Sequence, residues 1–342
     1  MSPSDAQTIA KNQQNNAIAG GGLHTAQLLA RPPLMERSGA QGVKRVKLEE
    51  HYRRAQKVAS ETVPVTWFRG LLMTLLRWGL SAIGLYKRGN RNALNLQLVK
   101  QDLFFDVLPA GLSKFRILHI SDLHLPARFP DLAKKIATLV KDVEVDLCVL
   151  TGDYRWGYYG NDDHLPKQLP GILKTIHTRY GTVACLGNHD KLETGALLEK
   201  MQIPVLYNEG FSITHNDSSL WVCGIDDPHI FNVDRIDQAV EDAPKDAFIL
   251  MLAHSPERIA EAEEAGVSLY LTGHTHGGQI RLPLIGALSK NAACTQEQVA
   301  GPWQHKTMQG YTSCGIGTTD LPVRYLCLPE AVIITLHQKA SN

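Results

Sequence analysis

FRILHISDLH, residues 115–124, carries the pattern that decides the fold, a short apolar run ending in polar side chains. The same pattern recurs in DLCVLTGD (146–153), TVACLGNHD (182–190), FILMLAH (248–254) and VSLYLTGHTH (267–276). Apolar runs of this length are typical of buried strands. Helix-like stretches lie between several of them, at residues 130–142, 166–179, 193–201, 235–242 and 256–265. Strands that alternate with helices predict an α/β domain with layered sheets.

Each of the five runs is followed by side chains of the kinds that bind metal ions. They are Asp122, His124, Asp153, Asn188, His189, Asp190, His254, His274 and His276. Functional residues of α/β sheets gather at the carboxyl ends of strands, so we expect these side chains at one edge. Taken singly, most of them also fit a turn or a core histidine. Five such sets at consecutive strand ends predict a metal site.

The ligand types indicate which ions the site would take. Mixed carboxylate, amide and imidazole ligands suit Mn, Fe or Zn better than Ca²⁺ or a thiolate zinc site. The supply is too large for one ion with an open position, so we expect two ions roughly 3.5–4 Å apart. The sequence offers no competing catalytic set, because it contains neither a phosphate-binding P-loop motif nor a G-x-S-x-G motif.

These motifs carry a family resemblance. D-x-H (122–124), G-D (152–153), G-N-H-D (187–190), His254 and G-H-T-H (273–276) resemble the calcineurin-like metallophosphoesterase family. The likeness covers residues 112–337, and the blocks at 224–228 and 315–330 are similar to its bacterial, often membrane-associated branch of phosphodiesterases and phosphohydrolases. The resemblance implies a four-layer α/β/β/α sandwich.

The resemblance also implies a role for each motif residue. One ion would be held by Asp122, His124 and His276, the other by Asn188, His254 and His274, with Asp153 bridging them. It implies that a bridging water or hydroxide attacks phosphorus in line, with two divalent ions, manganese favoured, lowering its pKa. His189 would act near the leaving group as general acid or hydrogen-bond donor, and Asp190 would orient its imidazole.

Other residues are candidates for weaker roles beside the site. They are Trp156, Tyr158, Tyr159, Asp226, Asp227, Arg324 and His119. The aromatic residues fit a substrate contact or loop packing, and the aspartates fit a turn as well as a substrate contact. Arg324 fits a phosphate contact or a solvated face, and His119 is expected to be structural. The six cysteines, none at CxxC spacing, predict buried free thiols in a reducing compartment.

The charge of the chain is divided between a basic arm and an acidic body. Of 35 Lys and Arg against 34 Asp and Glu in 342 residues, the first 110 residues carry 15 against 7. The composition, 44% hydrophobic and 20% charged, is that of a globular enzyme. It excludes a wholly disordered, collagen-like or multi-span membrane protein.

The most hydrophobic segment is VTWFRGLLMTLLRWGLSAIGLY, residues 65–86. Its length nearly spans a bilayer, but a central arginine costs roughly 2.5–3.5 kcal/mol on insertion scales, and Arg69 and Arg77 lie within it. On a helix these arginines share one polar sector, and Lys87, Arg88 and Arg91 follow. The pattern favours a helix lying in a membrane interface with cations at the headgroups. A spanning anchor, or a helix docked on the protein's own core or a partner, are the alternatives.

These patterns predict a domain organisation. We expect a disordered or partly helical basic extension over residues 1–62, an amphipathic membrane-interface helix over 63–91, and a metallophosphoesterase domain over 92–338. The N-terminus lacks the layout of a secretory signal, so a cytoplasmic protein, peripheral at the inner membrane, is expected. The expected partners are a phosphoester substrate and, through residues 65–91, an anionic membrane surface.

The expected function is that of a dinuclear metal-dependent phosphoester hydrolase, a phosphodiesterase or pyrophosphatase acting on a lipid-linked or nucleotide-sugar-lipid phosphate. A non-catalytic metal-binding scaffold of the same fold and a nuclease are the alternatives. The complete ligand set argues against the scaffold. The basic arm is compatible with nucleic-acid phosphates, but the Leu- and Trp-rich helix gains nothing from DNA, so nucleic acid is not an expected partner.

Overall fold

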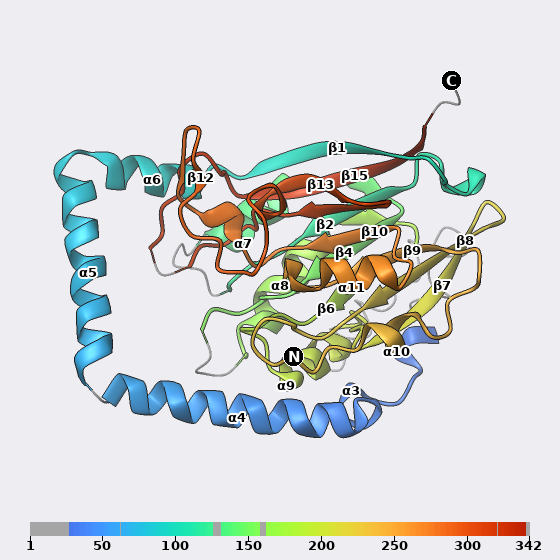
Figure 1. The fold of residues 1–342 in the computed structure, drawn as a ribbon, viewed down its shortest axis with the longest axis horizontal. Helices are drawn as coiled ribbons and strands as arrows, with labels where there is room; N and C mark the ends of the chain where they lie inside the picture. The colour runs from blue at the N-terminus through green and yellow to red at the C-terminus, as the bar shows by residue number, and fades with distance from the viewer. Residues whose placement is uncertain (1–26, 62, 126–130, 158–161, 320, 340–342) are drawn as a thin grey trace.

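Two β-sheets pack face to face in the computed structural model, which describes residues 27–61, 63–125, 131–157, 162–319 and 321–339 (Figure 1). The first sheet has the strand order β1 (Gln97–Phe105), β15 (Glu330–Gln338), β2 (Arg116–Ile120), β4 (Leu147–Thr151) and β6 (Thr182–Cys185). Neighbouring strands in it are parallel except β15 and β2, which are antiparallel.

The second sheet has a parallel centre and antiparallel edges. Its order is β13 (Gly301–His305), β14 (Met308–Thr312), β10 (Leu269–Thr272), β9 (Phe248–Leu252), β8 (Ser218–Gly224) and β7 (Glu209–His215). The pairs β13–β14 and β7–β8 are antiparallel, and the pairs between them are parallel. The small hairpin of β11 (Arg281–Leu282) and β12 (Gly286–Ala287) lies outside both sheets.

Apolar side chains on both faces of each sheet create four layers. The core between the sheets includes Ile117, Val149, Val222, Leu250 and Leu271. Helices α7 (Leu132–Leu139), α8 (Leu165–Leu173) and α9 (Leu192–Lys200) cover the outer face of the first sheet. Helices α10 (Ile236–Val240) and α11 (Ile259–Glu264) cover that of the second. The predicted four-layer α/β/β/α sandwich is confirmed.

One predicted helix is too long. The stretch 166–179 was expected to be helical throughout, but α8 ends at Leu173, and Ile176–Thr178 forms β5, which pairs in parallel with β3 (Val143–Val145). The Thr175 hydroxyl donates a hydrogen bond to the carbonyl of Ile172 at 2.8 Å, a local bond that competes with helix continuation.

An arm of four helices frames the body. It consists of α3 (Leu34–Arg37), α4 (Gly39–Glu61), α5 (Val63–Ala82) and α6 (Leu85–Ala93). Most of the expected basic extension at 1–62 that is described, residues 34–61, is therefore helical, whereas residues 1–26 lie outside the described residues. Among the described residues, none of the helices is long and apolar enough to cross a bilayer.

The two ends of the arm are fastened to the body. At one end, Leu34 of α3 is fully buried in the core beneath α9. At the other, the Asn92 amide donates to the carbonyl of Arg324 at 2.9 Å, and the Tyr325 hydroxyl donates to the carbonyl of Leu85 at 2.6 Å. Helices α4 and α5 connect these ends, and α5 stands away from the body (Figure 1).

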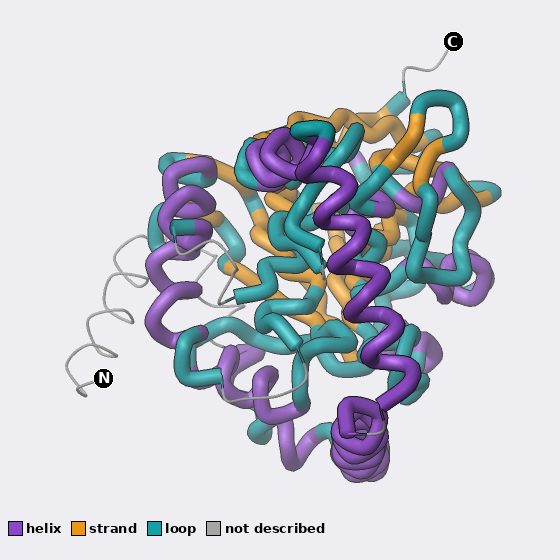
Figure 2. Tube along the Cα trace, turned by 90° about the vertical axis from the view of Figure 1, so that its left-hand side faces the viewer, coloured by secondary structure: helices purple, strands orange, loops and turns teal. Residues whose placement is uncertain are grey.

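The arm also crosses a particular side of the sandwich. Strands β2, β4, β6, β9 and β10 all end at the side of the body that faces α5 (Figure 1). Figure 2 turns this side toward the viewer, and α5 runs in front of the loops that follow the strands. Those loops therefore lie on the side of the body nearest α5.

Candidate metal centre

The first group of ligand atoms comes from the loop after β2 and the loop after β10. His124 Nε2 lies 3.0 Å from His276 Nε2. Asp122 Oδ1 lies 3.4 Å from His276 Nε2 and 4.0 Å from His124 Nε2. Asp122, His124 and His276, which we call the first cluster, are all buried and could hold one metal ion.

The second group comes from the loops after β6, β9 and β10. Asn188 Oδ1 lies 3.0 Å from His254 Nε2, and His274 Nδ1 lies 3.2 Å from the same nitrogen. We call Asn188, His254 and His274 the second cluster. The sequence-predicted ligands are thus brought together in the two sets that the motifs indicated.

Asp153, at the end of β4, lies between the two clusters. Its Oδ2 atom is 3.6 Å from His124 Nε2 and 3.4 Å from His254 Nε2. It forms a further group able to hold a metal ion with His254 and His274. Its other oxygen, Oδ1, accepts a hydrogen bond from the backbone amide of His189 at 2.9 Å. One carboxylate oxygen therefore remains directed at both clusters.

The backbone at these ligands is unusual. Five of them are non-glycine residues with positive φ: Asp122 (52°), His124 (46°), Asp153 (56°), His274 (68°) and His276 (50°). Such conformations are uncommon outside glycine and cluster at functional sites, where surrounding structure maintains them. The strand ends turn sharply here, which directs the side chains toward one another.

Main-chain carbonyls fix the orientation of three imidazoles. His254 Nδ1 donates to the carbonyl of Thr151 at 2.7 Å, and His274 Nε2 donates to that of Asn291 at 2.7 Å. His124 Nδ1 lies 3.2 Å from the carbonyl of Arg155. A ring nitrogen that donates in this way leaves the opposite nitrogen with a lone pair, the form that binds metals.

The oxygen atoms of Asp122 test whether a cation fits the first cluster. Asp122 Oδ2 accepts hydrogen bonds from the Ser121 hydroxyl at 2.6 Å and the His274 amide at 3.1 Å. Asp122 Oδ1 is buried, and within the described part of the chain no donor reaches it. A buried acceptor without a partner is costly. A divalent cation would satisfy it, so the residues present fit a metal ion.

The electrostatics favour the same conclusion. Burial disfavours the charge of Asp153, but the His254 and His189 imidazoles hold its pKa well below its usual range. Burial, reinforced by repulsion from Asp153, raises the pKa of Asp122 to about 6. Burial and the neighbouring His254 lower the pKa of His274 to about 3. Burial opposes the charge of His254, but the Asp153 carboxylate raises the pKa of its imidazole well above the ordinary value, so His254 would give up a proton on binding a metal ion. Two buried carboxylates confined with several imidazoles create an environment that divalent cations would stabilise.

Two glycines let the loops approach these carboxylates. A Cβ atom on Gly187 would lie 2.3 Å from Asp153 Oδ1, and one on Gly273 would lie 2.3 Å from Asp122 Oδ2. Both distances are shorter than any tolerated contact, so the sites need glycine. The G-N-H-D motif therefore begins with glycine because the Asp153 carboxylate occupies the space of a side chain, and G-H-T-H because the Ser121 hydroxyl, 1.9 Å from such a Cβ, and the Asp122 carboxylate do.

His189 is more exposed to solvent than the predicted ligands around it. Its side chain is 18% exposed, whereas those of Asp122, His124 and His254 are at most 2% exposed. The Trp156 ring stacks on His189 with centroids 6.0 Å apart and planes 16° apart. The expected position of Trp156 on a loop beside the site is thereby confirmed, while Tyr158 and Tyr159 lie outside the described residues.

Asp190 has a different role from the expected orientation of the His189 imidazole. Its Oδ2 atom accepts hydrogen bonds from the backbone amides of Asp153 at 2.7 Å and Gly187 at 2.8 Å, and Oδ1 accepts from the Tyr154 amide at 3.0 Å. Three backbone donors thus occupy both oxygens. Burial raises the pKa of Asp190 to about 7. The carboxylate holds two site loops together.

The weaker candidates are mostly structural. Asp227 accepts hydrogen bonds from the backbone amides of His229 and Ile230, as a turn residue does. Arg324 is fully buried rather than solvated, and its guanidinium donates to the carbonyls of Gly315 and Gly317 at 3.0 and 2.6 Å.

His119, expected to be structural, is buried in β2 with Nε2 2.8 Å from the Thr151 hydroxyl. All six cysteines are free, five of them buried. These positions need no ligand to explain them.

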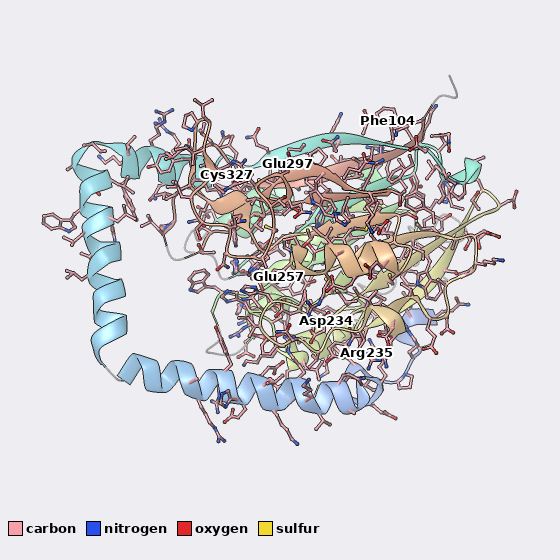
Figure 3. The ribbon with its side chains drawn as sticks, viewed as in Figure 1. Phe104, Asp234, Arg235, Glu257, Glu297 and Cys327 are labelled. Atoms are coloured by element: carbon pink, nitrogen blue, oxygen red, sulfur yellow. The ribbon has the colours of Figure 1, made fainter. Side chains whose placement is uncertain are left out.

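Two residues near the site were not predicted from the sequence. The His229 ring lies 4.2 Å from the His274 ring, and its Nδ1 is 2.7 Å from an oxygen of Glu257, labelled in Figure 3. A signal for it existed, because His229 directly follows the 224–228 block. The other residue is Arg45 of α4, which bonds the buried Asp226. No local pattern indicates that pairing.

A two-sheet sandwich whose strand ends bring Asp, Asn and His side chains together is an arrangement that could hold metal ions. The profile of the calcineurin-like phosphoesterase family matches residues 115–278. The metallophosphoesterase YkoQ of Bacillus subtilis is 31% identical over 68% of this chain and 86% of its own length. YkuE of the same organism is 29% identical over 69% and 83%. The phosphodiesterase YaeI of Escherichia coli is 27% identical over 65% and 82%. The chain belongs to the calcineurin-like metallophosphoesterase family.

Proposed function

We propose that the two clusters hold two divalent cations that share the Asp153 carboxylate. The observation that carries this proposal is the position of Asp153 Oδ2, 3.6 Å from an imidazole of the first cluster and 3.4 Å from one of the second. Oxygen and imidazole ligands suit manganese, iron or zinc, and we propose manganese as the ion of both sites. When bound, the pair would supply Lewis acidity and charge neutralisation to a phosphoester.

The residues of the chain have separate tasks in this proposal. The predicted ligands are buried, which would limit the access of water to the ions. His189 is more exposed than these ligands, and its side chain would give a hydrogen bond or a proton to the leaving-group oxygen. The backbone amide of His189 donates a hydrogen bond to Asp153 Oδ1 at 2.9 Å. His189 would therefore hold the leaving group at a set distance from the shared Asp153 carboxylate.

Hydrolysis of bis(p-nitrophenyl) phosphate tests the catalytic part. We expect turnover that requires Mn²⁺ and is abolished by EDTA. Asp153→Asn weakens the shared ligand and should lower kcat by at least about 100-fold, the scale of losing one charged group that stabilises a transition state. Turnover that survives chelation, or that Asp153→Asn leaves unchanged, would contradict the dinuclear proposal.

We further propose that the enzyme works as a peripheral protein at the anionic inner membrane surface. Helix α5 exposes Leu75 and Trp78, the latter to 75%, and the turn that follows it exposes Ile83. The β11–β12 hairpin, at the same end of the molecule as α5 in Figure 1, exposes Leu284 and Ile285. Exposed apolar side chains flanked by cations suit the boundary between lipid headgroups and acyl chains.

The cations are supplied next to these apolar side chains. Helix α6, which follows α5, carries Lys87, Arg88 and Arg91, and all three side chains are exposed. Because the loops that carry the predicted metal ligands lie on the side of the body nearest α5, a membrane seated on α5 would bring phosphoesters of lipids to that side of the body. A lipid-linked phosphate, including a nucleotide-sugar lipid, is therefore the substrate class that we propose.

Turnover of lipid substrates tests this part separately. We expect hydrolysis of UDP-sugar lipids or other lipid-linked phosphoesters in mixed vesicles to be faster than that of their water-soluble head groups. Equal rates for both, with bis(p-nitrophenyl) phosphate still hydrolysed, would leave the metal centre intact and overturn the lipid substrate.

A further inference from the structure

A buried arginine of the arm connects α4 to the loop that carries Asn188 and His189. The Arg45 side chain is completely buried. Its Nη2 donates to the main-chain carbonyl of Asp190 at 2.6 Å and to that of Gly187 at 3.3 Å. These carbonyls lie on either side of Asn188 and His189 in the chain. One guanidinium group thus holds both ends of a loop that provides a predicted ligand.

The remaining surface of Arg45 is also occupied. Nη1 lies 2.6 and 2.7 Å from the two oxygens of Asp226, and Nε donates to Glu49 at 2.8 Å. The Phe231 ring lies under the guanidinium, with its centroid 3.5 Å from Cζ. Glu49 in turn accepts from the amide of Leu192, the first residue of α9, at 2.9 Å. Such an arrangement admits a single position for the side chain.

The loop joins Arg45 to the centre through the main chain. The Asp190 amide donates to the Gly187 carbonyl at 3.2 Å, which closes the turn. The His189 amide donates to Asp153 Oδ1. Displacement of the Gly187 and Asp190 carbonyls would therefore move Asn188, whose Oδ1 atom lies 3.0 Å from His254 Nε2. The first cluster lies on other loops.

We propose that Arg45 is a positioning residue for the second cluster, and that the affinity for the ion held by Asn188, His254 and His274 depends on the seating of α4. The inference rests on the proposed dinuclear centre. It gives the arm a task in catalysis in addition to membrane contact, because α4 leads into α5. Loss of α4 from its seat would release the ion of the second cluster before that of the first.

Manganese titration of the full-length protein, followed by electron paramagnetic resonance, tests the inference. The wild-type protein should bind two Mn²⁺ ions and give the spectrum of an exchange-coupled pair. Arg45→Lys keeps the charge but loses the forked hydrogen bonds to the loop. We expect the Kd of the second ion to rise 10–100-fold, as for other partners that orient ligands, with the Kd of the first unchanged.

Two further variants keep the test decisive. Arg45→Met combined with Asp226→Asn removes both charges of the fully buried pair, so the Asp226 carboxylate is not left unpaired, and Glu49 keeps its hydrogen bond from the Leu192 amide. This double variant should raise the Kd of the second ion as Arg45→Lys does. Arg37→Met is the matched control: Arg37 also fastens the arm, 3.0 Å from Glu209, but no hydrogen bond of its side chain goes to the 187–190 loop among the described residues. It should leave both Kd values unchanged.

The outcomes are distinguishable. Unchanged Kd values in both Arg45 variants would overturn the inference. So would an equal rise in the Kd of both ions. A rise in the Kd of the second ion in Arg37→Met as large as in the Arg45 variants would overturn it as well. A wild-type protein that binds a single Mn²⁺ would defeat the dinuclear proposal itself, before any variant is measured.

Discussion

Helices α4 and α5 are consecutive in the arm, yet they meet their surroundings in opposite ways. Helix α4 is rich in charge, and its Arg45 is completely buried in the body. Helix α5 is the apolar one, and its Trp78 and Leu75 are 75% and 59% exposed. Hydrophobicity therefore does not identify the docked helix here. Directed hydrogen bonds seat α4, whereas the apolar side chains of α5 remain available to a lipid surface.

The difference has a practical consequence for experiments on the arm. A chain shortened to begin after α6 would lose Leu34 and Arg45 together with α5. Loss of membrane binding and loss of a metal ligand's position would then be confounded. Single substitutions separate the two helices, and the following ones are ordered by the size of the expected effect.

Leu34→Ala should give the largest effect. Leu34 is fully buried against α9, so truncation leaves a cavity and should lower the free energy of unfolding by about 3 kcal/mol, within the range for buried leucines. Leu75→Ala on α5 is the matched control and should change it by less than about 0.5 kcal/mol. Urea denaturation measures both. Leu34 belongs to α3, which leads into α4, so equal effects would contradict the contrast between the docked start of the arm and α5.

Removal of metal should increase hydrogen exchange in α4 and leave that of α5 unchanged. Ions that bind only the native state stabilise it by about 2.7 kcal/mol at 100 times Kd. If the 187–190 loop joins Arg45 to the second cluster, part of this effect reaches α4. Hydrogen exchange with Mn²⁺ and with EDTA should show faster exchange in α4 after chelation and no change in α5. If chelation speeds exchange in neither helix, or in both helices equally, the proposed coupling between α4 and the second cluster would be contradicted.

Trp78→Ser should give the smallest effect on the protein and a clear one on vesicles. An exposed indole contributes little to folding, so the free energy of unfolding should stay the same within about 0.5 kcal/mol. Partitioning onto anionic vesicles should fall about tenfold, which corresponds to roughly 1.4 kcal/mol of lost apolar burial. Vesicle sedimentation measures it.

Val107→Ser is the control for that measurement. Val107 is 85% exposed and follows β1, whose far end lies away from α5 in Figure 1. Its substitution should leave vesicle binding unchanged. A similar fall for both variants would mean that exposed apolar residues act regardless of their position, and α5 would lose its assignment.

The sequence predicts the parts of this molecule that are encoded locally. Apolar runs that end in Asp122, Asp153 or His254 predict both the strands and the convergence of their ends, because parallel strands bring their carboxyl ends to one edge. The glycine before Asn188 is part of the same local signal. These features depend on a few neighbouring residues, so the sequence motifs are sufficient to predict them.

The remaining features depend on distant partners. Arg45 meets Asp226, 181 residues away, and neither has a periodic or motif signal that indicates the other. Asp190 lies beside His189 in the chain, but its carboxylate turns toward backbone amides of another loop. Arg324 alternates with apolar residues as if on a solvated face, yet it lies buried among carbonyls. Only the folded chain shows which donors are close.

The most direct test of the account is anomalous X-ray scattering from Mn²⁺-loaded crystals of the full-length protein. The account predicts two anomalous peaks roughly 3.5–4 Å apart, one on each side of Asp153 Oδ2. One peak should lie against Asp122, His124 and His276, the other against Asn188, His254 and His274. A single peak, or peaks that do not share the Asp153 carboxylate, would contradict it.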